Sequence, residues 1–281
     1  MVKICAVQMN IKHHDIEKNY NNAIKFIKNI ERKECDFLIY PEIFLEGVIR
    51  EKYDLEKLAQ PIPGKYTDLF TKLAEEYGIH IVMGSIHEKT DDGYFNTSVL
   101  INDKGDIIGK YRKNKLWYKE KIFLKTSLEK PVFDTKYGKV GINICWDLAF
   151  PEIAKEIAQN GAKILFIPSF WSFEDKYDYL NDDKMLVNKI KEIETETKFI
   201  DTIITARAFE NEMIVVFSNG WGEYNIEGYK INLLGHTQIA MPVFGSVSKI
   251  EYGEGIVIND VDLKWLDIAE KMYKIREEYK K

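Results

Sequence analysis

Residues 141–152, GINICWDLAFPE, join a short apolar run to a Trp-Asp pair and then to Pro-Glu. The residues before Cys145 favour a buried strand, and Pro151 suits the first turn of a helix. Cys145 is therefore expected where a strand gives way to a helix, whose N–H groups can stabilise a thiolate or an oxyanion. A structural role is the alternative, because most free cysteines pack as small apolar side chains.

Strand-like and helix-like segments alternate on both sides of this stretch. Short apolar runs predict strands at 2–9, 37–40, 79–85, 95–101, 139–144, 163–168 and 213–217. Apolar spacing and end signals predict helices at 15–32, 66–77 and from Pro151 to about Asn160. This alternation, together with pairs of adjacent strands, predicts a layered α/β or α+β domain.

We expect residues 1–281 to form a single domain, because no internal repeat, low-complexity tract or linker interrupts them. Segment 172–201 stands out because it is dense in Asp, Glu and Lys, with apolar residues at helical spacing. It is either a solvated surface helix or an insertion that shapes a pocket rim or a subunit contact. Residues 263–279 predict a C-terminal helix.

The composition argues against several classes of protein. Forty basic residues stand against 45 acidic ones, and no basic face is evident, so nucleic acid is not an expected partner. No apolar stretch approaches the ~20 residues of a membrane-spanning helix, and the N-terminus lacks the apolar core of a signal peptide. The three cysteines, Cys5, Cys35 and Cys145, lie far apart without metal-ligand spacing. We therefore expect a cytoplasmic protein with no membrane partner and no metal.

A cysteine nucleophile needs a base, and histidine is the usual partner. None of the five histidines has a recognisable catalytic neighbourhood: His13, His14, His80, His87 and His236. A carboxylate must therefore be considered as the base.

Two further segments carry candidate side chains. Glu42 in DFLIYPEIF follows a buried strand, at the end where α/β folds tend to build sites. GKYRKNKLWYKE supplies Lys113 and Glu120. Taken alone, Glu42 would be an exposed loop residue and the lysine-rich run an ordinary solvated face.

Together, these segments resemble the motifs of the nitrilase superfamily of carbon–nitrogen hydrolases. PEIF is similar to the family's glutamate motif, YRKNKL to its lysine motif, and GINICWDLAFPE to its nucleophile motif. FNTSVLINDKGDIIGKYRK and ARAFENEMIVVFSN agree with other blocks of the family, and the resemblance covers nearly the whole chain. Lys115 stands where the family has histidine, a departure that bears on the local hydrogen bonding.

The resemblance implies a four-layer α-β-β-α sandwich and a catalytic triad of Glu42, Lys113 and Cys145. In this scheme Glu42 takes the thiol proton, while Lys113 and the backbone N–H of Trp146 stabilise the oxyanion. Glu120 orients Lys113 or the substrate. The scheme requires neither a metal nor an organic cofactor.

The implied reaction is hydrolysis of a small amide, an ω-amide or an N-carbamoyl compound through a thioester. CWDLAFPE looks more like the motif of amidases and carbamoyl amidases than the Cys-Trp-Glu of many nitrilases. Nitrile hydrolysis by the same triad is one alternative, and a catalytically silent scaffold that binds metabolites or proteins is another. The resemblance also implies a homodimer or a larger homo-oligomer.

Overall fold

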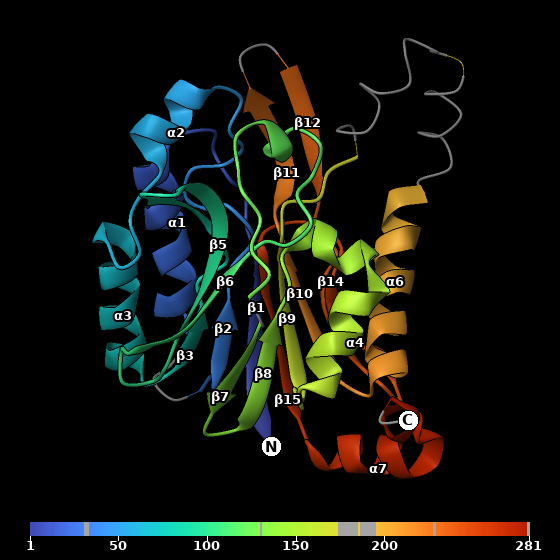
Figure 1. Cartoon of the computed structure of the whole chain (residues 1–281). Coiled ribbons are helices and arrows are strands. Elements are labelled where there is room, and N and C mark those ends of the chain that lie inside the picture. Colours follow the sequence, from blue (N-terminus) through green and yellow to red (C-terminus); the bar gives the residue numbers. More distant parts are fainter. Residues whose placement is uncertain (31–33, 130, 174–184, 186–194, 227–228, 280–281) are drawn as a thin grey trace.

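The computed structural model describes the chain except residues 31–33, 130, 174–184, 186–194, 227–228 and 280–281. Two large β-sheets pack face to face, and helices cover the outer face of each sheet (Figure 1). The layers therefore follow the order α-β-β-α, which confirms the predicted sandwich.

The first sheet has seven strands in the order β15-β1-β2-β3-β5-β4, with β6 paired to β5. Its strands are β1 (Val2–Gln8), β2 (Phe37–Ile39), β3 (His80–Val82), β4 (Ile86–Thr90), β5 (Gly93–Ile101), β6 (Ile107–Arg112) and β15 (Gly255–Val261). Strands β1, β2 and β3 are parallel, whereas β4, β5 and β6 form an antiparallel meander. Helices α1 (Ile16–Lys28) and α3 (Lys65–Tyr77) cover the outer face.

The second sheet has six strands in the order β14-β13-β10-β9-β8-β7. These are β7 (Val132–Thr135), β8 (Gly138–Ile142), β9 (Ile164–Ser169), β10 (Ile214–Asn219), β13 (Thr237–Met241) and β14 (Gly245–Ile250). Helices α4 (Pro151–Gln159) and α6 (Thr195–Asn211) cover its outer face. The other elements are α2 (Lys52–Leu58), α7 (Lys264–Tyr273), α8 (Ile275–Glu278), hairpin β11 (Trp221–Ile226) and β12 (Tyr229–Leu234), and 3₁₀ segments η1 (Glu120–Ile122) and η2 (Cys145–Ala149).

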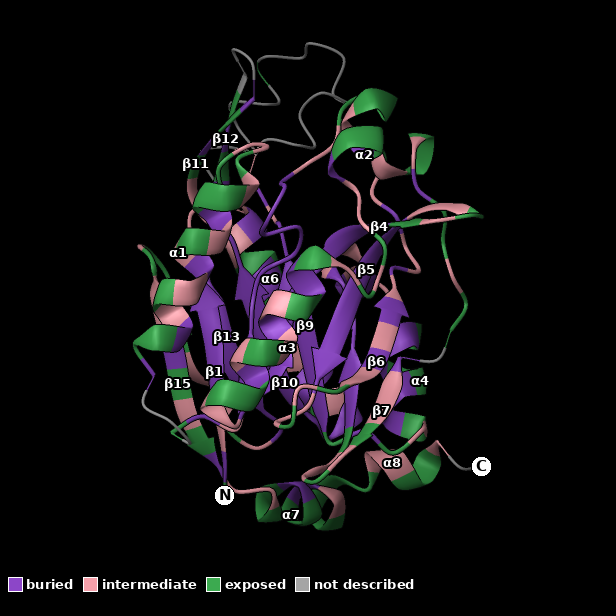
Figure 2. Cartoon of the chain, turned by 90° about the vertical axis from the view of Figure 1, so that its left-hand side faces the viewer, coloured by how far each residue is buried: buried purple, intermediate pink, exposed green. Residues whose placement is uncertain are grey.

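Alternating side chains along the central strands build three apolar layers. Phe37 and Ile39 of β2 pack between the sheets, whereas Leu38 packs beneath the helices of the first sheet. In β9, Phe166 faces the other sheet and Leu165 packs against the helices of the second. Because both faces are buried, these strands have continuous apolar sequences (Figure 2).

The C-terminal region differs from the single predicted helix at 263–279. The structure has two helices, α7 and α8, separated at Lys274, whose φ is +57°. The Glu212 carboxylate accepts hydrogen bonds from the backbone N–H groups of Ile275 and Arg276, at 3.0 and 3.2 Å. This acceptor compensates the free N–H groups of a new helix start, so the break is stabilised by a distant residue.

The structure also bears on the strand predicted at 79–85 and on segment 172–201. The strand predicted at 79–85 ends at Val82, because Gly84 has a φ of +46° and a new strand begins at Ile86. Most of segment 172–201 lies outside the described residues, so its predicted helix and its role stay predictions. No helix in the described part of the chain is long and apolar enough to span a bilayer.

Candidate active site

Loops that follow three strands bring the sequence-predicted side chains to one pocket. Glu42 follows β2, Lys113 directly follows β6, and Cys145 follows β8 as the first residue of η2. Glu42, Lys113, Glu120, Cys145 and Trp146 all line the same cavity of about 350 Å³. The residues that the sequence singled out therefore lie together, and their catalytic roles stay predictions.

Glu42 is a buried carboxylate that accepts hydrogen bonds from three directions. Its Oε1 accepts from Lys113 Nζ at 2.7 Å and from Asn96 Nδ2 at 2.8 Å. Its Oε2 accepts from the backbone N–H of Phe170 at 2.9 Å. The Glu42 backbone N–H also donates to Ser169 O at 3.2 Å, so contacts with both sheets hold the residue in place.

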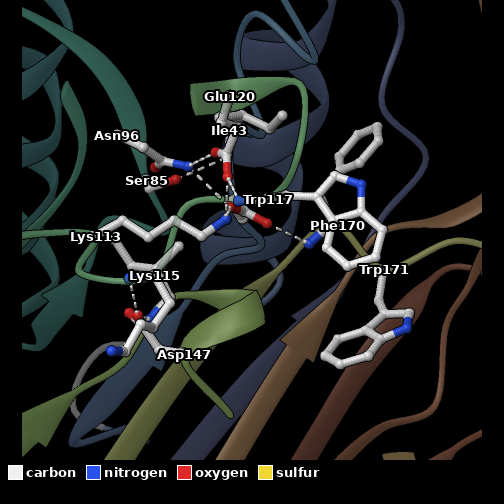
Figure 3. Close-up of polar contacts among 12 residues, drawn as sticks. Ile43, Ser85, Asn96, Lys113, Lys115, Trp117, Glu120, Asp147, Phe170 and Trp171 are labelled. Carbon is white, nitrogen blue, oxygen red and sulfur yellow. Dashed lines mark hydrogen bonds and ion pairs between the residues drawn. The ribbon is translucent and has the colours of Figure 1, made fainter. Parts of the chain in front are cut away.

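Lys113 lies between two carboxylates. Its Nζ is 2.7 Å from Glu42 Oε1 and 2.8 Å from Glu120 Oε2, and its side chain is 2% exposed (Figure 3). Burial acts to lower the pKa of Lys113, but the charges of Glu120 and Glu42 outweigh it and raise the pKa well above its usual value. The two carboxylates therefore stabilise the charged ammonium form of Lys113 in the pocket.

Asn96 and the chain at Trp117 hold Glu120 against Lys113. The Asn96 amide donates at 2.8 Å to Glu120 and at 2.8 Å to Glu42, so it bridges the two carboxylates (Figure 3). The Trp117 backbone N–H donates to Glu120 Oε2 at 2.7 Å. Burial acts to raise the pKa of Glu120, but Lys113 and these donors lower it overall, so Glu120 is ionised.

Cys145 has a left-handed backbone, with φ of +45°, which is uncommon for a residue other than glycine. Such conformations cost of order 1–3 kcal/mol and are frequent at functional sites. Burial, followed by the charge of Glu42, raises the pKa of the Cys145 thiol well above its usual value, against the opposing effects of Lys113 and the Phe170 N–H. These effects favour a protonated resting thiol over the thiolate that a helix start can stabilise, because the sulfur is partly buried beside a carboxylate.

Asp147 connects the cysteine turn to the lysine loop. Its buried carboxylate accepts from the backbone N–H groups of Ile144 at 3.0 Å and Lys115 at 2.7 Å, and from the Tyr111 hydroxyl at 2.8 Å. Burial raises the pKa of Asp147 to about 6, although the two backbone N–H groups act to lower it. These contacts hold the loops that carry Lys113 and Cys145 in one arrangement.

The side chain of Lys115 lies away from this arrangement. Its Nζ is 5.0 Å from the centre of the Phe150 ring and 4.0 Å from Glu152 Oε1. Only its backbone N–H contributes to the site, through Asp147. Lysine in place of the family's histidine therefore preserves the backbone contact to Asp147.

Aromatic side chains form much of the pocket wall. The Trp146 ring centroid lies 4.5 Å from that of Trp117 and 5.7 Å from that of Trp171. Trp171 Nε1 donates to Glu196 Oε2 at 2.9 Å, and Ser172 and Glu196 also line the cavity. The described ends of segment 172–201 thus contribute to the pocket, which is sized for a small molecule. Across the described residues, no cluster of three or more His, Cys, Asp or Glu side chains is placed to hold a metal ion.

Three contributors to the site were not predicted from the sequence. Asn96 lies in FNTS, within a segment that resembles the family. The resemblance implied no role for Asn96. Asp147 lies inside the nucleophile motif GINICWDLAFPE, which signals its importance but not the contacts that its carboxylate makes. The Phe170 contact uses a backbone N–H, which leaves no trace in the identity of a side chain.

The fold brings a partly buried cysteine, a buried lysine and a buried carboxylate into one pocket. The sequence profile of the carbon–nitrogen hydrolase family matches residues 3–267. The chain therefore belongs to the carbon–nitrogen hydrolase family and is a hydrolase.

Individual relatives agree with this assignment. A probable nitrilase of Schizosaccharomyces pombe is 30% identical, over 92% of this chain and 88% of its own length. The omega-amidase NIT2-B of Xenopus laevis is 27% identical, over 92% of this chain and 88% of its own length. The fold is shared with a solved structure, a carbon–nitrogen hydrolase from Helicobacter pylori, with a TM-score of 0.83 and 21% identity over 98% of this chain and 94% of that one.

Proposed function

We propose that this protein hydrolyses a small amide, ω-amide or N-carbamoyl compound through a thioester on Cys145. The observation that carries the proposal is the contact between Lys113 Nζ and Glu42 Oε1, 2.7 Å long, in the pocket that also contains the Cys145 thiol. This arrangement supplies a fixed carboxylate to accept a proton and a fixed cation beside the reacting sulfur.

In the first step, Glu42 accepts the thiol proton as the Cys145 sulfur bonds to the carbonyl carbon. The π electrons move to the carbonyl oxygen and form a tetrahedral oxyanion. The Lys113 ammonium and the Trp146 backbone N–H stabilise this charge, and one such donor is typically worth about 3 kcal/mol. Within the described part of the chain, the Trp146 N–H donates to no other acceptor, which leaves it available for this role.

In the second step, the oxyanion collapses and the carbon–nitrogen bond breaks. Glu42 returns its proton to the leaving nitrogen, so ammonia or an amine departs and a thioester remains. Water then gives a proton to Glu42 as its oxygen bonds to the thioester carbon. The carbon–sulfur bond of the resulting tetrahedral intermediate breaks, the acid departs, and Glu42 returns the proton to the Cys145 sulfur. Glu120 orients Lys113 through the 2.8 Å contact and does not transfer a proton itself.

Amide or carbamoyl hydrolysis is favoured over nitrile hydrolysis by the CWDLAFPE motif. The resemblance to the Xenopus omega-amidase points in the same direction. The family match and the presence of all the predicted side chains in one pocket favour a hydrolase over a silent scaffold.

Ammonia release from a panel of aliphatic amides, ω-amides, N-carbamoyl compounds and nitriles tests the reaction class. We expect turnover of amides or carbamoyl compounds, with activity abolished in Cys145→Ala and Glu42→Gln proteins that retain their circular dichroism spectra. Release from nitriles alone, or full turnover by either variant, would overturn the proposal.

We also propose that the protein acts in the cytoplasm as a homodimer or a larger homo-oligomer. Exposed aromatic pairs near the C-terminus support self-association, with ring centroids 5.0 Å apart for Phe209 and Tyr273 and 4.7 Å apart for Phe244 and Trp265. Light scattering coupled to size-exclusion chromatography tests this, and a monomer at micromolar concentration would contradict it.

A further inference from the structure

His87 and Glu46 form a second buried polar pair beside the proposed catalytic residues. His87 lies in β4 and Glu46 in the loop after β2, and each residue is 3% exposed. Glu46 Oε1 accepts the His87 backbone N–H at 2.5 Å and contacts His87 Nδ1 at 2.9 Å. Both contacts orient the imidazole ring relative to the backbone of its own strand.

The pairing determines which ring nitrogen is available to a ligand. An ionised carboxylate only accepts hydrogen bonds, so the Nδ1 that faces Glu46 carries a proton. In the neutral ring, Nε2 is then an acceptor on the opposite edge. His87 lines the pocket whereas Glu46 does not, and the side-chain hydrogen bond of His87 among the described residues is made by Nδ1, which leaves Nε2 on the other edge of the ring. An imidazole nitrogen on a pocket wall that makes no hydrogen bond within the described part of the chain is suited to a ligand that donates one.

Strand pairing places His87 next to the residues that surround the thiol. In the antiparallel pair β4–β5, His87 lies directly opposite Asn96. Residues opposite each other project from the same face of a sheet, with Cβ atoms about 4.5–5.5 Å apart. Asn96 in turn donates to both Glu42 and Glu120. The Asn96 side chain therefore links the position of His87 to these two carboxylates.

We propose that His87 Nε2 accepts a hydrogen bond from a hydroxyl or N–H group carried by the substrate near its scissile carbonyl. The inference rests on the proposed function, because it assigns the substrate class of the same pocket. His87 would then select amides that carry a hydrogen-bond donor over isosteric amides that carry a methyl group. Glu46 is a positioning residue, since it orients the ring without lining the pocket.

Matched pairs of amides test this selection. Lactamide and isobutyramide differ by a hydroxyl against a methyl next to the carbonyl carbon, and 3-hydroxypropanamide and butanamide differ in the same way one carbon further out. We expect a preference of about tenfold for the hydroxyl compound in at least one pair, measured both as kcat/KM and as calorimetric affinity for Cys145→Ala protein. His87→Phe should reduce that preference to less than twofold, and Glu46→Gln should reduce it in part.

His80→Phe is the matched control. His80 is a buried histidine of β3 that packs against the rings of Phe37 and Tyr137 and does not line the pocket. Its loss should leave the hydroxyl preference at the wild-type value. Equal preference in wild-type and His87→Phe proteins, or a preference for carboxylate-bearing amides instead, would overturn the inference.

Measuring both kcat/KM and calorimetric affinity separates the failure of this inference from the failure of the proposed function. If the wild-type protein released no ammonia from any amide, the proposed function would fail, while affinities for the Cys145→Ala protein would still test His87. If amides were hydrolysed without any hydroxyl preference, the inference would fail and the proposed function would stand.

Discussion

Lys113 Nζ lies 2.7 Å from Glu42 Oε1, and the two side chains are 2% and 4% exposed. Removing two charges from water costs several kcal/mol per ion, so a buried pair of this kind is a poor source of stability. The arrangement is better explained by chemistry, because it holds an ammonium group and a carboxylate beside a protonated thiol.

Lys113→Met should abolish activity and destabilise the protein by about 3–5 kcal/mol, because Glu42 and Glu120 would lose the buried cation between them. Chemical denaturation measures the loss. Adding Glu120→Gln to this variant should recover part of the stability but none of the activity. A stable and active Lys113→Met protein would contradict the role of the ammonium group.

The alkylation rate of Cys145 should depend on pH with a midpoint well above the usual value for a thiol, because burial and the Glu42 charge raise its pKa. Glu42→Gln removes that charge and should move the midpoint to lower pH. Lys113→Met should move it to higher pH. Peptide mass spectrometry after iodoacetamide treatment resolves Cys145 from Cys5 and Cys35, and identical midpoints in all three proteins would argue against electrostatic coupling.

Asp147 should make folding stability depend on pH. Its folded-state pKa is about 6, above the ordinary value of 3.8 for this side chain, so the folded protein binds the proton more tightly than the unfolded chain. The ionised carboxylate therefore costs stability, and this cost grows as pH rises from about 4 to about 6 and is complete above that. The rise of this pKa from 3.8 to about 6 corresponds to roughly 3 kcal/mol.

Asp147→Asn isolates this effect. The stability of the wild-type protein minus that of the variant should be larger at pH 4 than at pH 7, by about 2 kcal/mol. The variant should also lose activity, because the Lys115 and Ile144 contacts hold the lysine loop and the cysteine turn together. Urea denaturation at the two pH values measures the difference, and a difference that does not change with pH would refute the buried titration.

Lys115→His should change kcat/KM by less than about twofold and stability by less than about 0.5 kcal/mol, as for most surface substitutions. The reason is that only the backbone N–H of residue 115 reaches Asp147, while the side chain lies over the Phe150 ring. Steady-state kinetics provide the check. A large gain in activity would indicate that the side chain at this position acts in the pocket.

The sequence predicted the central strands well because burial on both faces leaves continuous apolar runs, as in β9 and β10. It missed β4, whose sequence IHEKT contains two buried polar residues. His87 is paired with Glu46, and Glu88 with Arg112, and these partners lie far from the strand in sequence. Polar residues satisfied by distant partners therefore concealed a buried strand.

In the active site, too, the sequence predicted some features and missed others. Motif resemblance identified Glu42, Lys113, Cys145 and Glu120 because their side chains are distinctive, but it could not provide the protonation state of the thiol. That state depends on burial and on the distance to Glu42, which are properties of the folded chain. The break at Lys274 likewise depends on Glu212, whose carboxylate approaches only after folding.

Trapping the covalent intermediate tests the central claim most directly. The protein is mixed with an amide that it hydrolyses, quenched in acid within milliseconds to seconds, digested, and examined by mass spectrometry. We expect the peptide that contains Cys145 to gain the acyl group of the amide with loss of one hydrogen, and the adduct to be absent from Cys145→Ala protein. Turnover without an adduct on Cys145 at any quench time, or an adduct on another residue, would contradict the account.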